Sequence, residues 1–173
     1  VDYMDAHPDC TLCFTNGYIE DQKNGGERRV FIPYSEKDAE YYRDEDRVFT
    51  VDDTYQMGFV PTASFVVRMD TLLKAVKEFT NVCPTGDLRL RLYITAFGHA
   101  YYLKDKTCVY RQNVSDSAMS RWKKYDRKQR FAHSKKIVDM IYHLDDITEG
   151  RYSEGLYKVA YDFVHSLILN SSS

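Results

Sequence analysis

The sequence lacks the run of about 18 apolar residues that a transmembrane helix requires, and it lacks a secretory signal peptide at its start. It also lacks an excess of charge of either sign. The 24 Lys and Arg residues nearly balance the 26 Asp and Glu residues, and a net charge of −2 gives no general attraction to nucleic acid. We therefore expect a cytoplasmic protein that does not bind nucleic acid.

Cysteine is scarce, with Cys10, Cys13, Cys83 and Cys108 as its only occurrences. Four cysteines could form two disulfides or a metal site. However, Cys10 and Cys13 fall in an apolar run typical of a strand, where an odd spacing places side chains on opposite faces. Cys83 and Cys108 lie far apart in the sequence. This pattern favours free, buried thiols in a reducing compartment, with a zinc site as the alternative.

Aromatic residues are abundant, with 15 Tyr and 9 Phe. Aromatic rings can stack on sugars, although most rings in a protein serve core and rim packing. Hydrophobic residues make up 43% and charged residues 29%, which is typical of a globular protein. A length of 173 residues fits one domain that can bury a sizeable core.

Two parts are expected along the chain: a mixed α/β part over residues 1–118 and a helical hairpin extension over residues 119–170. In the first part, the helix that Asp70 caps should place Leu72, Leu73, Val76 and Phe79 in the core. Alternating leucines also allow a strand at 87–97, but Gly98 directly after it favours a helix. The expected elements are strands at 11–19, 59–68, 100–103 and 107–110, and helices at 70–79 and 87–97.

The second part should contain two helices. Ser117 or Ser120 is expected to cap one long helix that continues to about Leu144, and Gly150 should end the turn that follows. The second helix carries an apolar stripe formed by Leu156, Val159, Ala160, Phe163, Val164 and Leu167. At the other end of the chain, residues 1–7 and Pro8 have the pattern of a terminating helix. We therefore expect the chain to begin inside a longer protein.

Three sequence motifs occur in order: 60–68 (VPTASFVVR), 84–88 (PTGDL) opening the helix that ends at Gly98, and 101–103 (YYL) followed by 109–111 (VYR). In this order and spacing, residues 1–122 resemble bacterial inverting glycosyltransferases of family 2. The resemblance implies an α/β fold, namely the C-terminal, acceptor-side part of a GT-A (nucleotide-diphospho-sugar transferase) mixed sheet. It also implies transfer of a sugar from a nucleotide-sugar to a saccharide or lipid-linked acceptor, with inversion, in cell-surface polysaccharide synthesis.

The same resemblance suggests site residues. Asp87 is the implied catalytic base, since inverting transfer needs a carboxylate to remove the acceptor's proton. An ordinary helix cap is the other interpretation of Asp87. The residues implied to bind the acceptor are Pro61, Thr62, Ser64 and Gly86, and Arg111 is implied to be a cofactor-binding residue.

The resemblance also bears on the metal and on the partners. Asn113 stands where the family has a histidine, and an amide is a poorer metal ligand. A divalent ion, Mg or Mn, would be held mostly by an N-terminal half that this chain lacks, so no metal is expected in the chain itself. We expect this chain alone to be inactive. A sheet edge left open by that missing half could pair with a second copy, giving a homo-oligomer.

Other charged segments favour simpler interpretations. The run Asp44-Glu45-Asp46 lies between arginines after two tyrosines, which favours a solvated surface over a metal site. Residues 121–136 carry eight Lys and Arg, which favours a solvated helix face, with membrane-surface contact as the alternative. The rival to a transferase is a non-catalytic module that binds a saccharide or another protein.

Overall fold

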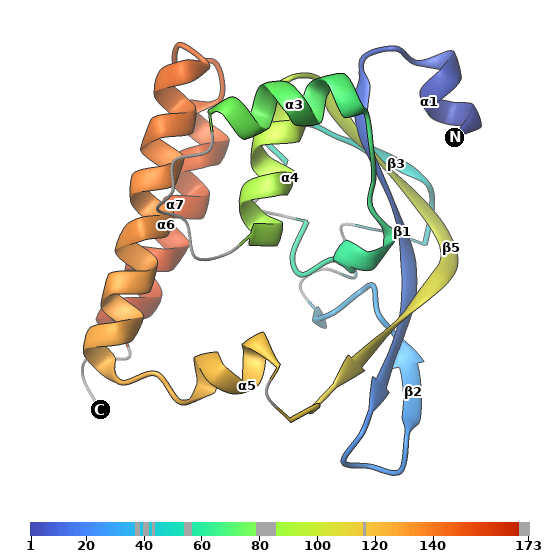
Figure 1. The fold of residues 1–173 in the computed structure, drawn as a ribbon, viewed down its shortest axis with the longest axis vertical. Helices are drawn as coiled ribbons and strands as arrows, with labels where there is room; N and C mark the ends of the chain where they lie inside the picture. Colours follow the sequence, from blue (N-terminus) through green and yellow to red (C-terminus); the bar gives the residue numbers. More distant parts are fainter. Residues whose placement is uncertain are drawn as a thin grey trace.

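A computed structural model of the chain describes residues 1–36, 39, 42, 44–53, 57–78, 86–115 and 117–169. The described part is a mixed α/β fold, as the sequence predicted, with a sheet on one side and a helical hairpin on the other (Figure 1). The elements are α1 (Asp2–Ala6), β1 (Cys10–Asp21), β2 (Glu27–Val30), β3 (Arg47–Phe49), η2 (Thr62–Ser64), β4 (Val66–Val67), α3 (Met69–Lys77), α4 (Gly86–Ala96), β5 (His99–Gln112), α5 (Ala118–Lys123), α6 (Arg127–Ile147) and α7 (Ser153–Leu169).

The centre of the sheet is a long parallel pair, β1 and β5. On the outer edge of β1, β4 and β2 pair antiparallel with different parts of the strand. On the outer edge of β5, β3 pairs antiparallel. A parallel pair needs a long crossover connection, and here residues 22–98 supply it, including α3 and α4.

Helix α4 joins the sheet to the hairpin. Figure 1 shows α4 between the strands and the α6–α7 pair. On the sheet side, the Thr11 hydroxyl of β1 donates a hydrogen bond to the Ile94 carbonyl of α4 at 2.8 Å. On the hairpin side, the buried Tyr93 hydroxyl reaches the Met140 carbonyl of α6 at 3.5 Å. The predicted helix at 87–97 is therefore confirmed, and it is the central helix of the core.

The strand predicted at 59–68 is largely wrong. Only Val66–Val67 pairs with β1, and Thr62–Ser64 forms a 3₁₀ turn. Pro61 has no N–H that could donate a hydrogen bond to a neighbouring strand. The Thr15 N–H of β1 instead donates to the Ser64 hydroxyl at 3.0 Å, where in a regular sheet it would donate to a backbone carbonyl of the next strand. The two short strands predicted at 100–103 and 107–110 are instead one continuous strand, β5, which has irregular register opposite Asn16.

The helix predicted from Asp70 is present, but only part of its predicted face meets the core. Helix α3 begins at Met69, so Arg68 and not Asp70 is at the cap position, and its buried residues are Thr71 and Ala75. Leu72 is partly buried and packs against the core, as predicted, and Phe79 lies outside the described residues. Leu73 is 57% exposed and Val76 49% exposed, contrary to the prediction. The apolar spacing identified a helix correctly, but α3 meets the core through Thr71, Leu72 and Ala75, and not through Leu73 and Val76.

The long helix predicted from Ser117 is two helices. Ser117 caps α5, as expected, by accepting the Ser120 N–H at 3.1 Å. The chain then leaves the helix, and Asp126 starts α6 with a reciprocal capping box, in which Asp126 and Gln129 each bond the other's backbone N–H. The hairpin of α6 and α7 forms as predicted, with Leu156, Val159 and Ala160 buried on α7 and Phe163 packed against the core. Val164 is 41% exposed, contrary to the prediction, and the side chain of Leu167 lies outside the described part.

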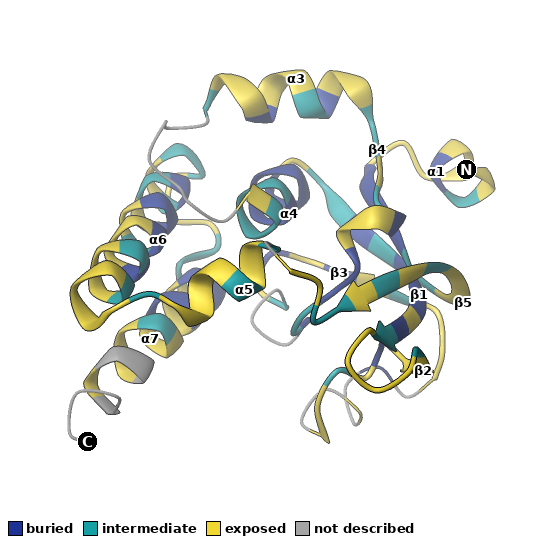
Figure 2. Cartoon of the chain, turned by 60° about the horizontal axis from the view of Figure 1, so that its bottom comes forward, coloured by how far each residue is buried: buried dark blue, intermediate teal, exposed yellow. Residues whose placement is uncertain are grey.

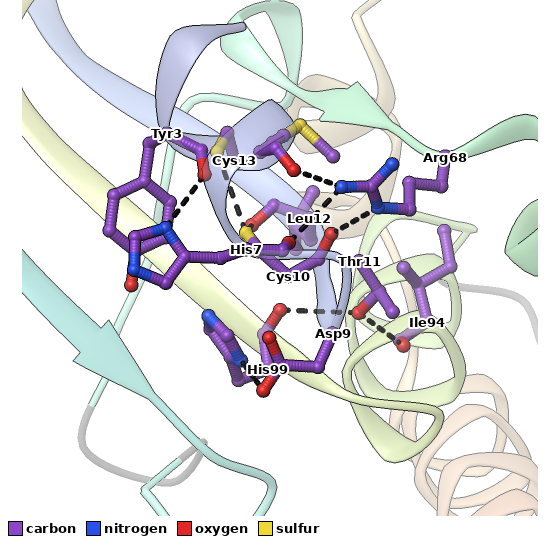
Figure 3. Close-up of polar contacts among 11 residues, drawn as sticks. Tyr3, His7, Asp9, Cys10, Thr11, Leu12, Cys13, Arg68, Ile94 and His99 are labelled. Atoms are coloured by element: carbon purple, nitrogen blue, oxygen red, sulfur yellow. Dashed lines mark hydrogen bonds and ion pairs between the residues drawn. The ribbon is translucent and has the colours of Figure 1, made fainter.

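Cys10 and Cys13 lie together, which contradicts the prediction of opposite faces. Their sulfurs are 3.7 Å apart, because the register of β1 against β5 shifts between Cys10 and Leu12 and re-aims the side chains (Figure 3). Both thiols are free and buried. The hydrogen bond from the Cys10 thiol lowers the pKa of Cys13, and the same bond together with burial raises the pKa of Cys10. Cys83 lies outside the described residues.

Hydrogen bonds from Arg68 hold α1 and the start of β1 together. Its Nε donates to the Cys10 carbonyl at 2.8 Å, and its Nη2 donates to the His7 carbonyl at 3.1 Å and to the Met4 carbonyl (Figure 3). The short helix predicted for the first residues is thus present, and a single guanidinium satisfies three carbonyls around its end.

Candidate functional site

Asp87 lies in the first turn of α4, directly after residues 79–85, which are outside the described part of the chain. Its side chain is partly exposed, and its Oδ1 accepts the Leu88 N–H at 2.9 Å. Within the described residues, Oδ2 has no hydrogen-bond partner. A carboxylate held by one oxygen at the positive end of a helix keeps its second oxygen available to another molecule.

Arg91 follows one turn later on the same face of α4 and is buried. Its guanidinium donates to the Gly58 carbonyl at 2.8 Å, but its buried Nε has no partner among the described residues. Burial lowers the pKa of Arg91, while the nearby Tyr42 and Asp87 side chains act in the opposite direction. The cation therefore links the Asp87 turn to the Gly58 segment.

An aromatic cluster lies next to this turn. Phe31, Tyr34, Phe59 and Tyr110 pack in pairs with ring centroids 5.2 to 5.7 Å apart. Burial raises the pKa of Tyr110, and Tyr34 and Asp87 add to this effect. Asp87 is the smallest of the three causes, so its carboxylate lies within electrostatic range of the end of β5.

A small recess opens beside the cluster, between the end of β5 and α5. Tyr34, Phe59 and Tyr110 form its aromatic wall. Its other wall consists of Met119 and six polar residues: Arg111, Gln112, Asn113, Ser117, Ser120 and Lys123. Its volume of about 20 Å³ accommodates only about one water molecule. A sugar ring would enter only if these side chains moved apart.

The structure brings some of the residues implied by the resemblance together. Arg111 is exposed, follows Tyr110 in β5 and lines the recess, and Tyr110 in turn lies near Asp87. Gly86, at the start of α4, is exposed next to Asp87.

The 3₁₀ turn η2, which holds the implied acceptor residues Pro61, Thr62 and Ser64, is attached to the sheet. It packs against β1 and β5, Pro61 is buried in it and Thr62 is exposed. The Ser64 hydroxyl is nearly buried and bonds to the Thr15 backbone and to the Pro61 carbonyl. Ser64 therefore fixes η2 to β1, while Thr62 and Ala63 are exposed, and Thr62 alone of these two has a polar side chain.

Asn113 joins the ends of the two central strands. It adopts a left-handed conformation with φ of 61°, which asparagine tolerates better than most residues. Its Nδ2 donates to the Asp21 carboxylate of β1 at 2.8 Å, and this bond lowers the pKa of Asp21. The Asn113 amide, which lines the recess, thus has a structural partner in Asp21.

The acidic run at 44–46 also has structural partners. Asp46 accepts the Lys104 N–H at 3.0 Å and the Tyr101 hydroxyl at 3.3 Å, and so fastens its loop to β5. Among the described residues, no group of three His, Cys, Asp or Glu side chains is placed to hold a metal ion.

Sequence reasoning missed Arg91 and the aromatic cluster. A signal was present, since Phe59 directly precedes the VPTAS segment and Tyr110 precedes Arg111. What the sequence did not show is that Phe31 and Tyr34, from the segment after β2, complete the same cluster.

No family model, curated protein or solved structure matches this chain. Within the described ranges, no helix is both long enough and apolar enough to cross a membrane.

Proposed function

We propose that this chain is the acceptor-side part of an inverting glycosyltransferase with a GT-A fold, and that Asp87 is its catalytic base. The observation that carries the proposal is the position of Asp87. Its carboxylate is partly exposed at the start of α4, one oxygen is held by the Leu88 N–H, and it neighbours the aromatic cluster. The order of the three sequence motifs supports the same assignment.

In the proposed reaction, Asp87 accepts the proton of an acceptor hydroxyl while that oxygen attacks the anomeric carbon of the donor sugar. The new carbon–oxygen bond forms as the bond to the diphosphate breaks, and the nucleoside diphosphate leaves with the bonding electrons. Attack opposite to the leaving group inverts the anomeric centre. Arg111 at the recess would bind the departing diphosphate as a charge-assisted partner.

The neighbouring residues fit the acceptor role. Rings such as Tyr34, Phe59 and Tyr110 offer apolar faces for sugar C–H groups, while Thr62 and the exposed backbone at Gly86 offer hydrogen-bonding groups. A divalent Mg or Mn ion would neutralise the diphosphate. The described residues do not supply a set of ligands for it, so we assign it to the donor-binding half and derive no step through it.

The stereochemistry of the product tests the proposal. The full-length protein that contains this chain would be incubated with Mn²⁺ and a panel of uridine-, guanosine- and thymidine-diphospho-sugars. NMR would then compare the anomeric configuration of donor and product. We expect nucleoside diphosphate release and an inverted linkage. A retained configuration would contradict the mechanism, and saccharide binding without any turnover would favour the non-catalytic module.

A further inference from the structure

Positive charge is concentrated in one part of the chain. Residues 118–136 contain eight of the 24 Lys and Arg residues and one of the 26 Asp and Glu residues, which gives this segment a formal charge of +7 in a chain of net charge −2. Five of these cations are exposed at α5 and the start of α6, and we call them the basic surface: Arg121, Lys123, Lys124, Arg127 and Lys128. Figure 2 shows α5 exposed along most of its length.

These cations are available to a partner. In the part of the chain that the structure describes, none of the five forms an ion pair, whereas Lys135 further along α6 pairs with Asp139 at 2.6 Å. The nearby carboxylate of Asp126 accepts the Gln129 N–H as a helix cap. The charge of the basic surface is therefore not neutralised by the described neighbours.

Apolar side chains are exposed among the cations. Met119 is 42% exposed and Trp122 39% exposed, and their spacing along α5 places them on one face of the helix. The Trp122 ring is held by Arg130, whose guanidinium lies 5.2 Å from the ring centroid and whose Nε donates to the Tyr125 carbonyl at 3.0 Å. The structure thus fixes a tryptophan at the surface instead of burying it.

We propose that the basic surface, with Met119 and Trp122, binds the surface of an anionic phospholipid bilayer. Lys and Arg attract anionic headgroups, and tryptophan prefers the boundary between headgroups and acyl chains. The exposed methionine favours a bilayer over a nucleic acid, because a thioether gains nothing from phosphates or base edges. The sequence analysis preferred a solvated helix face, and the exposure of Trp122 and Met119 is what changes that interpretation.

The basic surface lies next to the recess. Met119 and Lys123 of α5 also line the recess beside Tyr110 and Arg111. Bilayer binding would hold the recess close to the membrane, where a lipid-linked acceptor resides. This use rests on the proposed function, but the bilayer binding itself does not, so the two can fail separately.

Trp122 is the only tryptophan of the chain, so its fluorescence reports directly on the proposed contact. The chain would be titrated at about 0.15 M salt with vesicles of phosphatidylcholine alone and with vesicles containing about one-third phosphatidylglycerol. We expect binding and a blue shift of the emission with the anionic vesicles, and neither with phosphatidylcholine alone. Lipids carrying a quencher in the upper acyl chain should quench Trp122.

A pair of variants tests whether vesicle binding depends on the basic surface or only on the total positive charge of the chain. K124Q/K128Q removes two cations of the basic surface and should weaken vesicle binding about 25-fold, since each cation contributes about a fivefold factor. The control K74Q/K77Q removes two lysines from α3, which lies at the opposite end of the molecule from α5 in Figure 1, and should bind as the parent does. Absence of vesicle binding, equal binding by the two variants, binding without a blue shift, or tighter binding to RNA than to vesicles would each overturn the proposal.

Discussion

Asp87 and Asp70 are a matched pair of acidic residues at the starts of helices. Each accepts the N–H of the next residue, Leu88 at 2.9 Å and Thr71 at 2.7 Å. The two differ in their surroundings, because Asp87 lies near the buried Arg91 and Tyr110, whereas Asp70 is on the exposed side of α3. The local hydrogen bond alone therefore does not distinguish a catalytic carboxylate from a helix cap, and the neighbours of Asp87 support its proposed role.

Two glycines give a prediction for stability at this scale. A Cβ at Gly98 would lie 2.1 Å from the Asp9 carbonyl oxygen and 2.6 Å from the Thr11 methyl carbon, so the turn between α4 and β5 has room only for glycine. We expect Gly98→Ala to lower the free energy of unfolding by about 1–3 kcal/mol. Gly86→Ala is the control, because nothing lies within 4 Å of its Cβ. Urea unfolding should show Gly86→Ala unchanged or slightly more stable, and an equal loss in both variants would contradict the packing described here.

Among the elements, the division between α5 and α6 has a clear local cause. Helix α5 ends at Lys123, and the capping box of Asp126 and Gln129 begins a new helix, α6. Helix α6 then contributes Ile137, Met140, Ile141 and Leu144 to the core. The separate orientation of α5 keeps Trp122 and Met119 at the surface next to the recess.

The capping box can be tested by thermal melting. Asp126→Ala removes the side-chain acceptor for the Gln129 N–H and should cost about 1 kcal/mol, or about 2–4 °C in Tm. Asp139→Ala is a suitable control, because it removes only an exposed ion pair with Lys135 on the same helix. A Tm of Asp126→Ala that matches this control would show that α6 does not depend on its cap.

The sequence predicted most elements of the fold, and the errors have physical explanations. Apolar patterns identified β1, α6 and α7, whereas at α4 the pattern also allowed a strand, and Gly98 correctly favoured the helix. They failed at 59–68, where a hydrogen bond with the Ser64 side chain takes the place of a neighbouring strand, and in part at α3, where Leu72 packs against the core but Leu73 and Val76 are exposed. Opposite faces for Cys10 and Cys13 assumed regular pleating, which the irregular register at the start of β1 breaks.

For the site, the sequence predicted single residues but not their assembly. The sequence motifs pointed to Asp87 and Arg111 separately. That Tyr110, which precedes Arg111, lies within electrostatic range of Asp87 depends on the packing of α4 beside β5. The aromatic wall also needs Phe31 and Tyr34, which follow β2 and have no motif of their own. Contacts between segments so far apart in the chain follow from the topology of the sheet.

On the scale of the whole molecule, three features of the fold belong to the proposed site. The Asp87 turn, the recess at the end of β5 and the basic surface of α5 follow one another around the aromatic cluster and the β5–α5 connection. In the proposed enzyme, the acceptor hydroxyl is deprotonated at Asp87, the diphosphate is bound at Arg111, and α5 rests on the bilayer.

The most direct test of this proposal is the transfer rate of Asp87→Asn in the full-length protein. Asparagine keeps the shape of the side chain and can still accept the Leu88 N–H, but it cannot take a proton from the acceptor. We predict a fold and a donor affinity like those of the parent, and a turnover number lower by ~10²–10⁴-fold. Asp70→Asn makes the same chemical change at the start of α3 and should leave turnover unchanged. Turnover by Asp87→Asn close to that of Asp70→Asn, with donor and acceptor saturating, would contradict the assignment of Asp87 as the base.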